Sequence, residues 1–174
     1  MKKQVITTIV LFIFFYLQAF AAGKTLITYP APQGTDLNDD YSVQVRQDGG
    51  NWLQTPSYLV KVDRVSNTKH NEERSSVSSF DFSGEAEVSV TYNKGEVKSA
   101  RIRPLSYGIT PTIKGNTITF KLNQPGNISI EVNGDIYHNL QLFANPLESI
   151  TYKKSSKRVI YFGPGIHNCK GNGW

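Results

Sequence analysis

The clearest architectural signal in the sequence is the run Lys114-Gly-Asn-Thr-Ile-Thr-Phe-Lys-Leu-Asn-Gln-Pro-Gly-Asn-Ile-Ser-Ile-Glu-Val-Asn-Gly-Asp135. It holds two short segments in which every second residue is apolar, and this period of two is typical of a strand with one buried face. Turn residues precede, separate and follow the segments, namely 114–116, 124–127 and 133–135. The run therefore predicts β-strands connected by tight turns.

The same pattern extends to both sides of this run. Residues 41–47 and 86–92 alternate apolar and polar side chains, and Leu140 and Leu142 continue the alternation after the last turn. No segment beyond residue 21 carries an apolar period of 3.6 over a helical length. We therefore predict an all-β fold, an antiparallel immunoglobulin-like β-sandwich formed by residues 41–158.

Three local features refine this prediction. The turn sequence at 93–96 lies between two strand-like segments and predicts a hairpin that joins them. Residues 65–76 are polar and charged with almost no apolar anchor, which predicts an exposed loop. Residues 22–40 are rich in Pro, Gly, Asp and Asn, so we expect a lead-in segment in which only 26–29 can form a short strand.

The N-terminal segment has the pattern of a secretory signal peptide over residues 1–21. Lys2 and Lys3 precede an apolar run, and Ala19-Phe-Ala21 places small residues at alternate positions. The apolar run is shorter than the ~20 residues that a helix needs to cross a bilayer. We expect a secreted, periplasmic or cell-surface protein without a transmembrane segment after cleavage. A retained N-terminal anchor is the alternative.

Length and charge limit the function classes. Removal of 21 of the 174 residues leaves 153, enough for one sandwich-sized domain. It also lowers the formal charge from +5 to +3, because the removed segment holds two lysines and no acid. The largest basic cluster is Lys153-Lys154 with Lys157-Arg158. Nucleic acid is therefore not an expected partner.

Chemically reactive residues are sparse. Cys169 is the single cysteine, which excludes an internal disulfide and leaves a buried thiol, an intermolecular bridge or a partner cysteine elsewhere. His70, His138 and His167 lie in no nucleophile motif, and no His or Cys pair has metal-ligand spacing. The residues therefore predict no catalytic group, no metal and no cofactor within this chain.

Two pairs of side chains are candidates for contacts. Arg101 and Arg103 project to the same side of one predicted strand, where they could hold a carboxylated sugar or the acidic face of a neighbouring domain. Their alternative is an ordinary solvated sheet face. Trp52 and Tyr107 could contribute to an aromatic platform for sugar rings, and their alternative is packing in the core.

Three segments together resemble a known group of enzymes. They are Arg101-Ile-Arg-Pro-Leu-Ser106, the stretch from Ile130 to Pro146 that ends in Phe-Ala-Asn-Pro, and Val159-Ile-Tyr-Phe-Gly-Pro-Gly-Ile-His167. Over residues 41–174 the chain resembles the N-terminal β-sandwich domain and domain junction of glycoside hydrolase family 49 and related family 28 enzymes. This is the dextranase and polygalacturonase-like group.

The resemblance implies an accessory role. In that group the sandwich precedes a right-handed parallel β-helix, which holds the catalytic aspartates of an inverting hydrolase. Residues 159–174 correspond to the junction and first strand of such a β-helix, expected downstream, so no catalytic residue is carried over. The implied interdomain contacts are Arg101, Arg103, Asn145, Pro146, Phe162, Gly163, Pro164 and Gly165.

We therefore expect the accessory domain of a secreted polysaccharide-degrading enzyme, inactive alone, which braces or caps the catalytic β-helix. Its partners are that β-helix and, through the parent enzyme, a polysaccharide. The alternative is a free-standing secreted carbohydrate-binding or adhesion module. A surface-exposed envelope protein is a third option, favoured only if the signal peptide is not cleaved.

Overall fold

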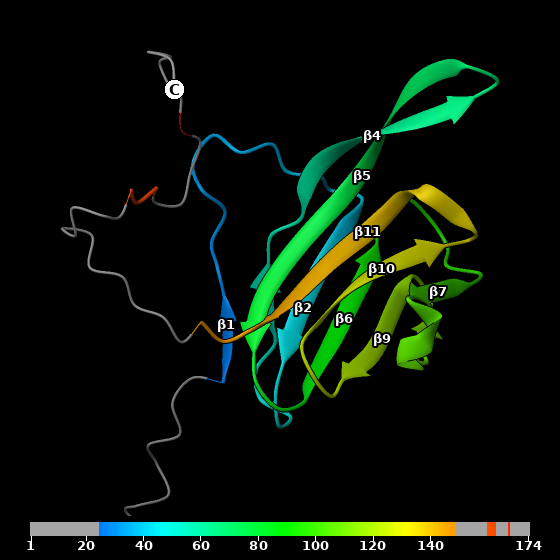
Figure 1. Ribbon diagram of the computed structural model, residues 1–174. Helices are drawn as coiled ribbons and strands as arrows, with labels where there is room; N and C mark the ends of the chain where they lie inside the picture. The colour runs from blue at the N-terminus through cyan, green and yellow to red at the C-terminus, as the bar shows by residue number, and fades with distance from the viewer. Residues whose placement is uncertain (1–24, 149–159, 163–166, 168–174) are drawn as a thin grey trace, which may run out of the picture.

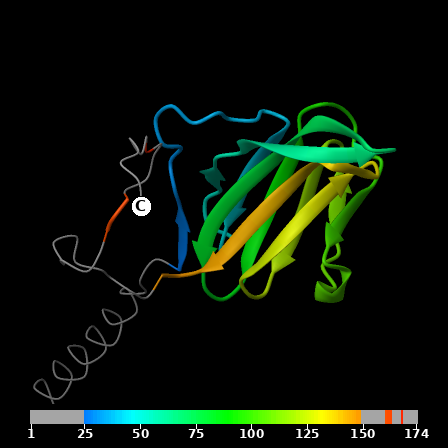
Figure 2. The same ribbon diagram turned by 45° about the horizontal axis from the view of Figure 1, so that its top comes forward.

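A computed structural model describes residues 25–148, 160–162 and 167. Its regular structure is almost entirely β, in two layers (Figures 1 and 2), which confirms the all-β prediction. The elements are β1 (Leu26–Thr28), β2 (Tyr41–Arg46), β3 (Leu53–Thr55), β4 (Tyr58–Ser66), β5 (Lys69–Phe82), β6 (Ala86–Tyr92), β7 (Ala100–Arg103), a 3₁₀ turn η2 (Leu105–Tyr107), β8 (Thr112–Lys114), β9 (Thr117–Leu122), β10 (Gly126–Val132) and β11 (Asp135–Pro146). The predicted signal peptide, 1–21, lies outside the described residues, and so does most of the predicted junction, 159–174.

Two sheets form the layers. Sheet A has the order β1-β5-β11-β10-β7, and β4 pairs with the first part of β5. Sheet B has the order β3-β2-β6-β9-β8. Because apolar and polar residues alternate along the strands, each sheet turns one apolar face toward the other. The predicted immunoglobulin-like arrangement of these strands stays a prediction.

The core lies between the two sheets. Sheet A contributes Ile128, Ile130, Leu140 and Leu142 among others, and sheet B contributes residues such as Val88. Burial of each such side chain stabilises the fold by roughly 1.5–3 kcal/mol. The alternating apolar residues of the run 114–135 are all buried in this core, as their period of two predicts.

One strand pair runs in parallel. β5 and β11 pair from Leu140↔Ser76 to Pro146↔Phe82 in the same direction, so sheet A is mixed and the expected antiparallel pairing is wrong for this pair. Hairpins force antiparallel pairing only between consecutive strands. β5 and β11 are separated by β6 to β10, and part of that connection lies in the other sheet, which leaves their relative direction free.

The predicted exposed loop at 65–76 is instead part of a long hairpin arm. β4 and β5 pair along their whole overlap, from Tyr58↔Val77 to Ser66↔Lys69, and the arm projects beyond the rest of the sandwich (Figure 1). Asn67 and Thr68 form its two-residue turn with φ of 48° and 67°. The segment has no apolar alternation because the projecting part exposes both of its faces.

The predicted hairpin across 93–96 is also wrong. β6 lies in sheet B and β7 in sheet A, so this connection crosses from one sheet to the other. Val97 is buried in the core and anchors the crossing. The side chain of Asn133 holds it as well, because its amide donates to the carbonyl of Glu96 and its oxygen accepts from the N–H of Lys98 at 2.8 Å.

No helix in the described part of the chain is long and apolar enough to cross a membrane.

Candidate functional site

A cleft of about 870 Å³ lies at the end of β9. Within the described part of the chain, β8 pairs with β9 only between residues 117 and 119. The cleft is lined by residues 106–110 and by outward-facing residues of sheet B, among them Arg46, Glu87 and Lys121. Trp52 and Tyr107, the two predicted sugar contacts, both line this cleft.

Tyr107 is held in place by local backbone structure. The 3₁₀ turn η2 ends at Gly108, whose φ of 64° lets its N–H donate to the carbonyl of Leu105 at 3.1 Å. The ring of Tyr107 lies against the backbone of Gly126, where a Cβ atom would come within 3.0 Å of the ring. Because Gly126 has no Cβ, the ring can lie against its backbone. Tyr107 remains 50% exposed in this position.

Trp52 also lines the cleft, and its ring contacts an arginine that is itself held by an ion pair. The guanidinium of Arg46 lies 4.3 Å from the centre of the indole ring, which is a cation–π contact. Nε and Nη2 of Arg46 both donate to Oε2 of Glu87, at 2.9 and 2.6 Å. The carboxylate thus orients the guanidinium, and the guanidinium orients the indole.

The floor between the two aromatic residues is polar and its charges are compensated. Lys121 on β9 donates to Glu85 at 2.7 Å, and this hydrogen bond raises the pKa of the lysine. Thr112 and Thr119 are direct cross-strand partners on the same face. Each cationic side chain that lines the cleft therefore has a carboxylate partner.

Sequence reasoning missed Arg46, Glu87 and Lys121 as parts of this site. The alternation along β2, β6 and β9 indicates that they point outward, but it does not indicate that they are neighbours. The strand register places Arg46 opposite Glu87 and Glu87 opposite Lys121, in one row across sheet B. Register between strands depends on the whole fold, so no local signal identifies this row.

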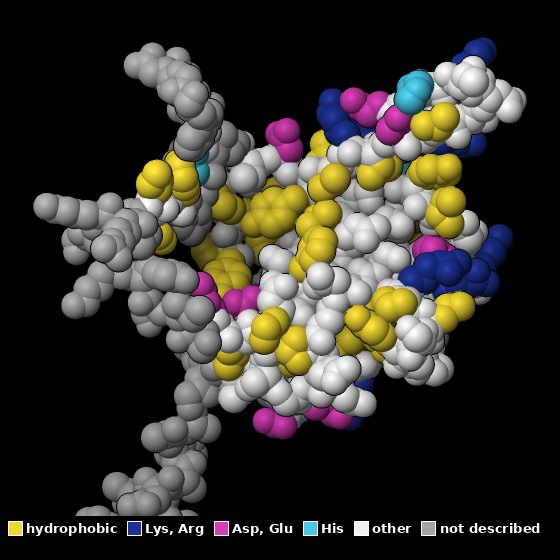
Figure 3. Space-filling view, in the orientation of Figure 1, with side chains coloured by type: hydrophobic (Ala, Val, Ile, Leu, Met, Phe, Trp, Pro, Cys, Tyr) yellow, Lys and Arg dark blue, Asp and Glu magenta, His cyan; other side chains and the backbone are white. Residues whose placement is uncertain are grey.

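The two predicted arginine contacts lie on β7, at an edge of sheet A where basic side chains gather (Figure 3). Arg103 donates from Nε to Oε1 of Glu131 at 2.5 Å, and the Glu131 side chain is only 7% exposed. Arg101 is exposed, and among the described residues it has no ion-pair partner. Arg103 is therefore paired within the sandwich, and a contact of the two arginines with a sugar or another domain stays a prediction.

A second, more open hollow of about 540 Å³ lies on the outer face of sheet A. It is lined by Arg103 and Phe143 together with short polar side chains such as Ser129. Phe143 is partly exposed there. This hollow lies on the opposite sheet from the cleft at β9.

The remaining predicted interdomain contacts have different environments. Asn145 donates to Asp81 at 3.3 Å within sheet A, and Asp81 also accepts from the hydroxyl of Tyr29. This hydrogen bond, together with burial, raises the pKa of Tyr29 to about 12. Pro146 is exposed at the end of β11, and Phe162 is exposed with its ring edge against His167. Residues 163–165 lie outside the described residues.

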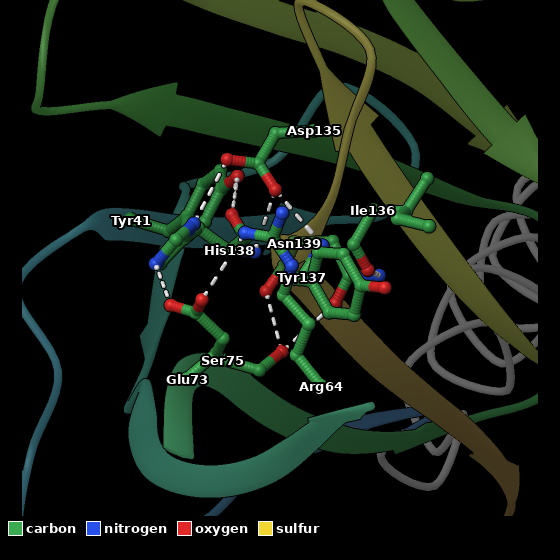
Figure 4. A network of polar contacts seen from close by, with 9 residues as sticks. All are labelled: Tyr41, Arg64, Glu73, Ser75, Asp135, Ile136, Tyr137, His138 and Asn139. Atoms are coloured by element: carbon green, nitrogen blue, oxygen red, sulfur yellow. Dashed lines mark hydrogen bonds and ion pairs between the residues drawn. The ribbon is translucent and has the colours of Figure 1, made fainter. Parts of the chain in front are cut away.

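A polar network surrounds His138 near the start of β11 (Figure 4). Its Nδ1 lies 2.8 Å from Asp135 and its Nε2 lies 3.2 Å from Glu73, which also contacts Arg64 at 3.4 Å. The hydrogen bond to Asp135 raises the pKa of His138. Tyr41 donates to the carbonyl of His138 at 2.8 Å, so the network ties the β4–β5 arm, β2 and the last hairpin together.

No group of three or more His, Cys, Asp or Glu side chains within the described ranges is placed to hold a metal ion. The other predicted histidine of the sandwich, His70, pairs with Asp63 at 2.6 Å on the exposed arm. Neither histidine of the sandwich is next to a nucleophilic Ser or Cys in a hydrogen-bonded arrangement.

Comparison with known proteins gives one informative result. No family model and no curated protein matches the sequence. Among solved structures, the chain is similar to Dex49A from Penicillium minioluteum, with a TM-score of 0.56 and 16% identity. The match covers 74% of this chain and 34% of Dex49A, so this chain spans about a third of that protein. At this identity the likeness is one of fold, and it supports the expected relation to family 49 at that level.

Proposed function

We propose that this chain forms an accessory β-sandwich domain of an exported polysaccharide-degrading glycoside hydrolase. The observation that carries the proposal is the fold likeness to part of Dex49A, a dextranase of glycoside hydrolase family 49. The domain braces or caps a catalytic β-helix that follows it. Exported enzymes of this kind meet their polymeric substrate outside the cell, in keeping with the predicted signal peptide.

The described carboxylates support a non-catalytic role for the sandwich itself. An inverting glycosidase needs one protonated carboxyl and one free carboxylate, which face each other across about 6.5–9.5 Å. Glu87 and Glu131 are each bonded to an arginine, Asp81 is bonded to Tyr29 and Asn145, and Asp135 is bonded to His138. Each of these four carboxylates therefore already has a partner within the sandwich.

The interdomain contacts belong to this proposal. Pro146 is exposed at the end of β11, and Phe162 is exposed further along the chain, which suits contact with a following domain. Arg101 is exposed on the β7 edge, has no ion pair with any residue that the structure describes, and suits an acidic neighbour. The proposed contact therefore includes these side chains and the segment 163–165.

The proposal is tested by assaying the purified protein on dextran and on polygalacturonan. We expect no release of reducing ends above the buffer blank, because the resemblance to family 49 implies that the catalytic aspartates belong to the following β-helix. Release of reducing ends that persists after further purification contradicts the proposal. A folded state, checked by circular dichroism and a cooperative thermal transition, is the control for a silent result.

The second candidate function is a free-standing carbohydrate-binding or adhesion module. The observation that favours it is the presence of Trp52 and Tyr107 in one cleft. The two functions differ in partner: a free-standing module acts without a catalytic domain, whereas an accessory domain is isolated from its source together with one. Isolation of the native protein therefore distinguishes them.

A further inference from the structure

We infer that the cleft between residues 106–110 and the outer face of sheet B binds a short stretch of an uncharged glycan chain. The inference concerns this cleft alone. It holds or fails separately from the proposed place of the domain in a glycoside hydrolase, because a glycan site can serve a domain within an enzyme or a module by itself.

The aromatic side chains supply the apolar part of such a site. A pyranose ring has an apolar face of C–H groups and a rim of hydroxyls, and the face packs well on an aromatic ring. Tyr107 is half exposed, and its ring is held against Gly126. Trp52 is oriented by Arg46, which lies over its ring. Both rings are therefore ordered before a ligand arrives, which lowers the entropy cost of binding.

The polar lining supplies partners for the hydroxyl rim. The cleft contains six hydroxyl and amide side chains, which are Ser106, Thr110, Thr112, Thr119, Asn123 and Gln124. Within the described part of the chain, no hydrogen bond occupies these side chains. Hydroxyl and amide groups both donate and accept, so they match sugar hydroxyls, which also do both.

The charges of the cleft favour an uncharged ligand. Arg46 is neutralised by Glu87 at 2.6 Å, and Lys121 is neutralised by Glu85 at 2.7 Å. A uronic acid chain needs an unpaired cation to offset the loss of water around each carboxylate. The lining cations are already paired, so a neutral chain is favoured over an acidic one.

The dimensions of the cleft suit more than one sugar ring. Its volume of about 870 Å³ lies within the usual range of ligand sites. The row from Arg46 through Glu87 to Lys121 crosses three neighbouring strands, which spans about 10 Å at ~4.8 Å per strand. Trp52 lies at the Arg46 end of this row, and residues 106–110 face the β9 end.

The experiment is calorimetric titration of the full chain with maltotetraose, isomaltotetraose and cellotetraose, and with tetragalacturonate as the acidic comparison. We expect at least one neutral tetrasaccharide to bind at millimolar concentration and to bind more tightly than tetragalacturonate. Tyr107→Ala should weaken that binding about tenfold or more, and Tyr107→Phe should retain most of it, because stacking needs the ring.

Two further variants separate the cleft from other surfaces. Gly126→Ala keeps the tyrosine but places a Cβ 3.0 Å from its ring, so it should displace the ring and weaken binding. Phe143→Ala removes a partly exposed aromatic side chain from sheet A and should leave binding within about twofold of the unmodified protein. A melting curve for each variant checks that it folds.

Three results overturn the inference. They are absence of binding by every neutral tetrasaccharide to folded protein, undiminished binding by the folded Tyr107→Ala variant, and tighter binding of tetragalacturonate than of any neutral chain. None of them bears on whether the protein hydrolyses polysaccharides or is isolated with a catalytic domain.

Discussion

A single histidine connects separate parts of this fold. His138 lies between Asp135 and Glu73, and the hydrogen bond to Asp135 raises its pKa above the usual value of 6.5 (Figure 4). A group whose pKa is raised by folding stabilises the folded state below its unfolded pKa. That contribution is lost as pH rises through the folded pKa. Its size is small, below about 1 kcal/mol, because the side chain is 43% exposed.

We therefore predict that His138→Gln lowers the free energy of unfolding at pH 5.5 and has a smaller effect at pH 9. Urea unfolding at both pH values measures the difference. His70→Gln is the matched control, because the contact of His70 with Asp63 stays within the exposed β4–β5 arm and does not link the arm to β11. An equal effect of His138→Gln at both pH values contradicts this account.

Two serines on the inner side of β5 should respond differently to loss of the hydroxyl. Ser78 is hydrogen-bonded to the carbonyl of Pro56 at 2.8 Å, whereas the buried Oγ of Ser76 has no partner within the described residues. Removal of a satisfied buried hydroxyl costs about 1 kcal/mol, and removal of an unsatisfied one costs nothing or stabilises. We predict that Ser78→Ala lowers the midpoint of denaturant unfolding and that Ser76→Ala does not. A larger loss for Ser76→Ala contradicts the prediction.

At the scale of single elements, the turn of the β4–β5 arm is strained. Thr68 has a φ of 67°, a conformation that β-branched residues rarely adopt, and Asn67 has 48°. Two-residue hairpin turns with positive φ at both positions favour Asn-Gly. We predict that Thr68→Gly stabilises the arm by about 0.5–1 kcal/mol. Hydrogen exchange of the arm amides measures this change.

The matched control uses the turn between β10 and β11. Asn133 and Gly134 have φ of 55° and 80°, so this turn already has the favoured pair. Gly134→Thr should therefore destabilise the protein by an amount comparable to the gain from Thr68→Gly. Faster exchange of the arm amides in Thr68→Gly contradicts the assignment of this turn.

The success of sequence reasoning varied from one element to another for a physical reason. β9 and β10 were predictable because one face of each enters the core and the other meets solvent, which imposes an apolar period of two. The β4–β5 arm exposes both faces and therefore lacks that period. The turn at 93–96 indicates a change of direction, but it does not indicate which sheet the next strand joins.

The same limit applies to the site. The residue types of Trp52 and Tyr107 suggested sugar contacts, and the structure brings both to one cleft. The ion pair between Arg46 and Glu87, which orients the indole, depends on the register of β2 with β6. The salt bridge between Arg103 and Glu131 depends in the same way on the register of β7 with β10.

At the scale of the whole molecule, the described structure is a two-layered β-sandwich, and the cleft beside β9 is the proposed glycan site. Its fold is similar to part of Dex49A over 74% of this chain. The likeness is one of fold, and the proposed role as an accessory domain of a polysaccharide-degrading enzyme goes beyond it. The claim concerns the assembly to which the domain belongs, so it must be tested on native material.

The most direct test is capture of the native protein from its source with antibodies against residues 25–148, followed by an assay of the captured material on dextran and polygalacturonan. The account predicts that captured material releases reducing ends, while the same amount of the purified chain releases none. Captured material that hydrolyses neither polymer, with the sandwich present and folded, contradicts the claim that the domain belongs to a polysaccharide-degrading enzyme.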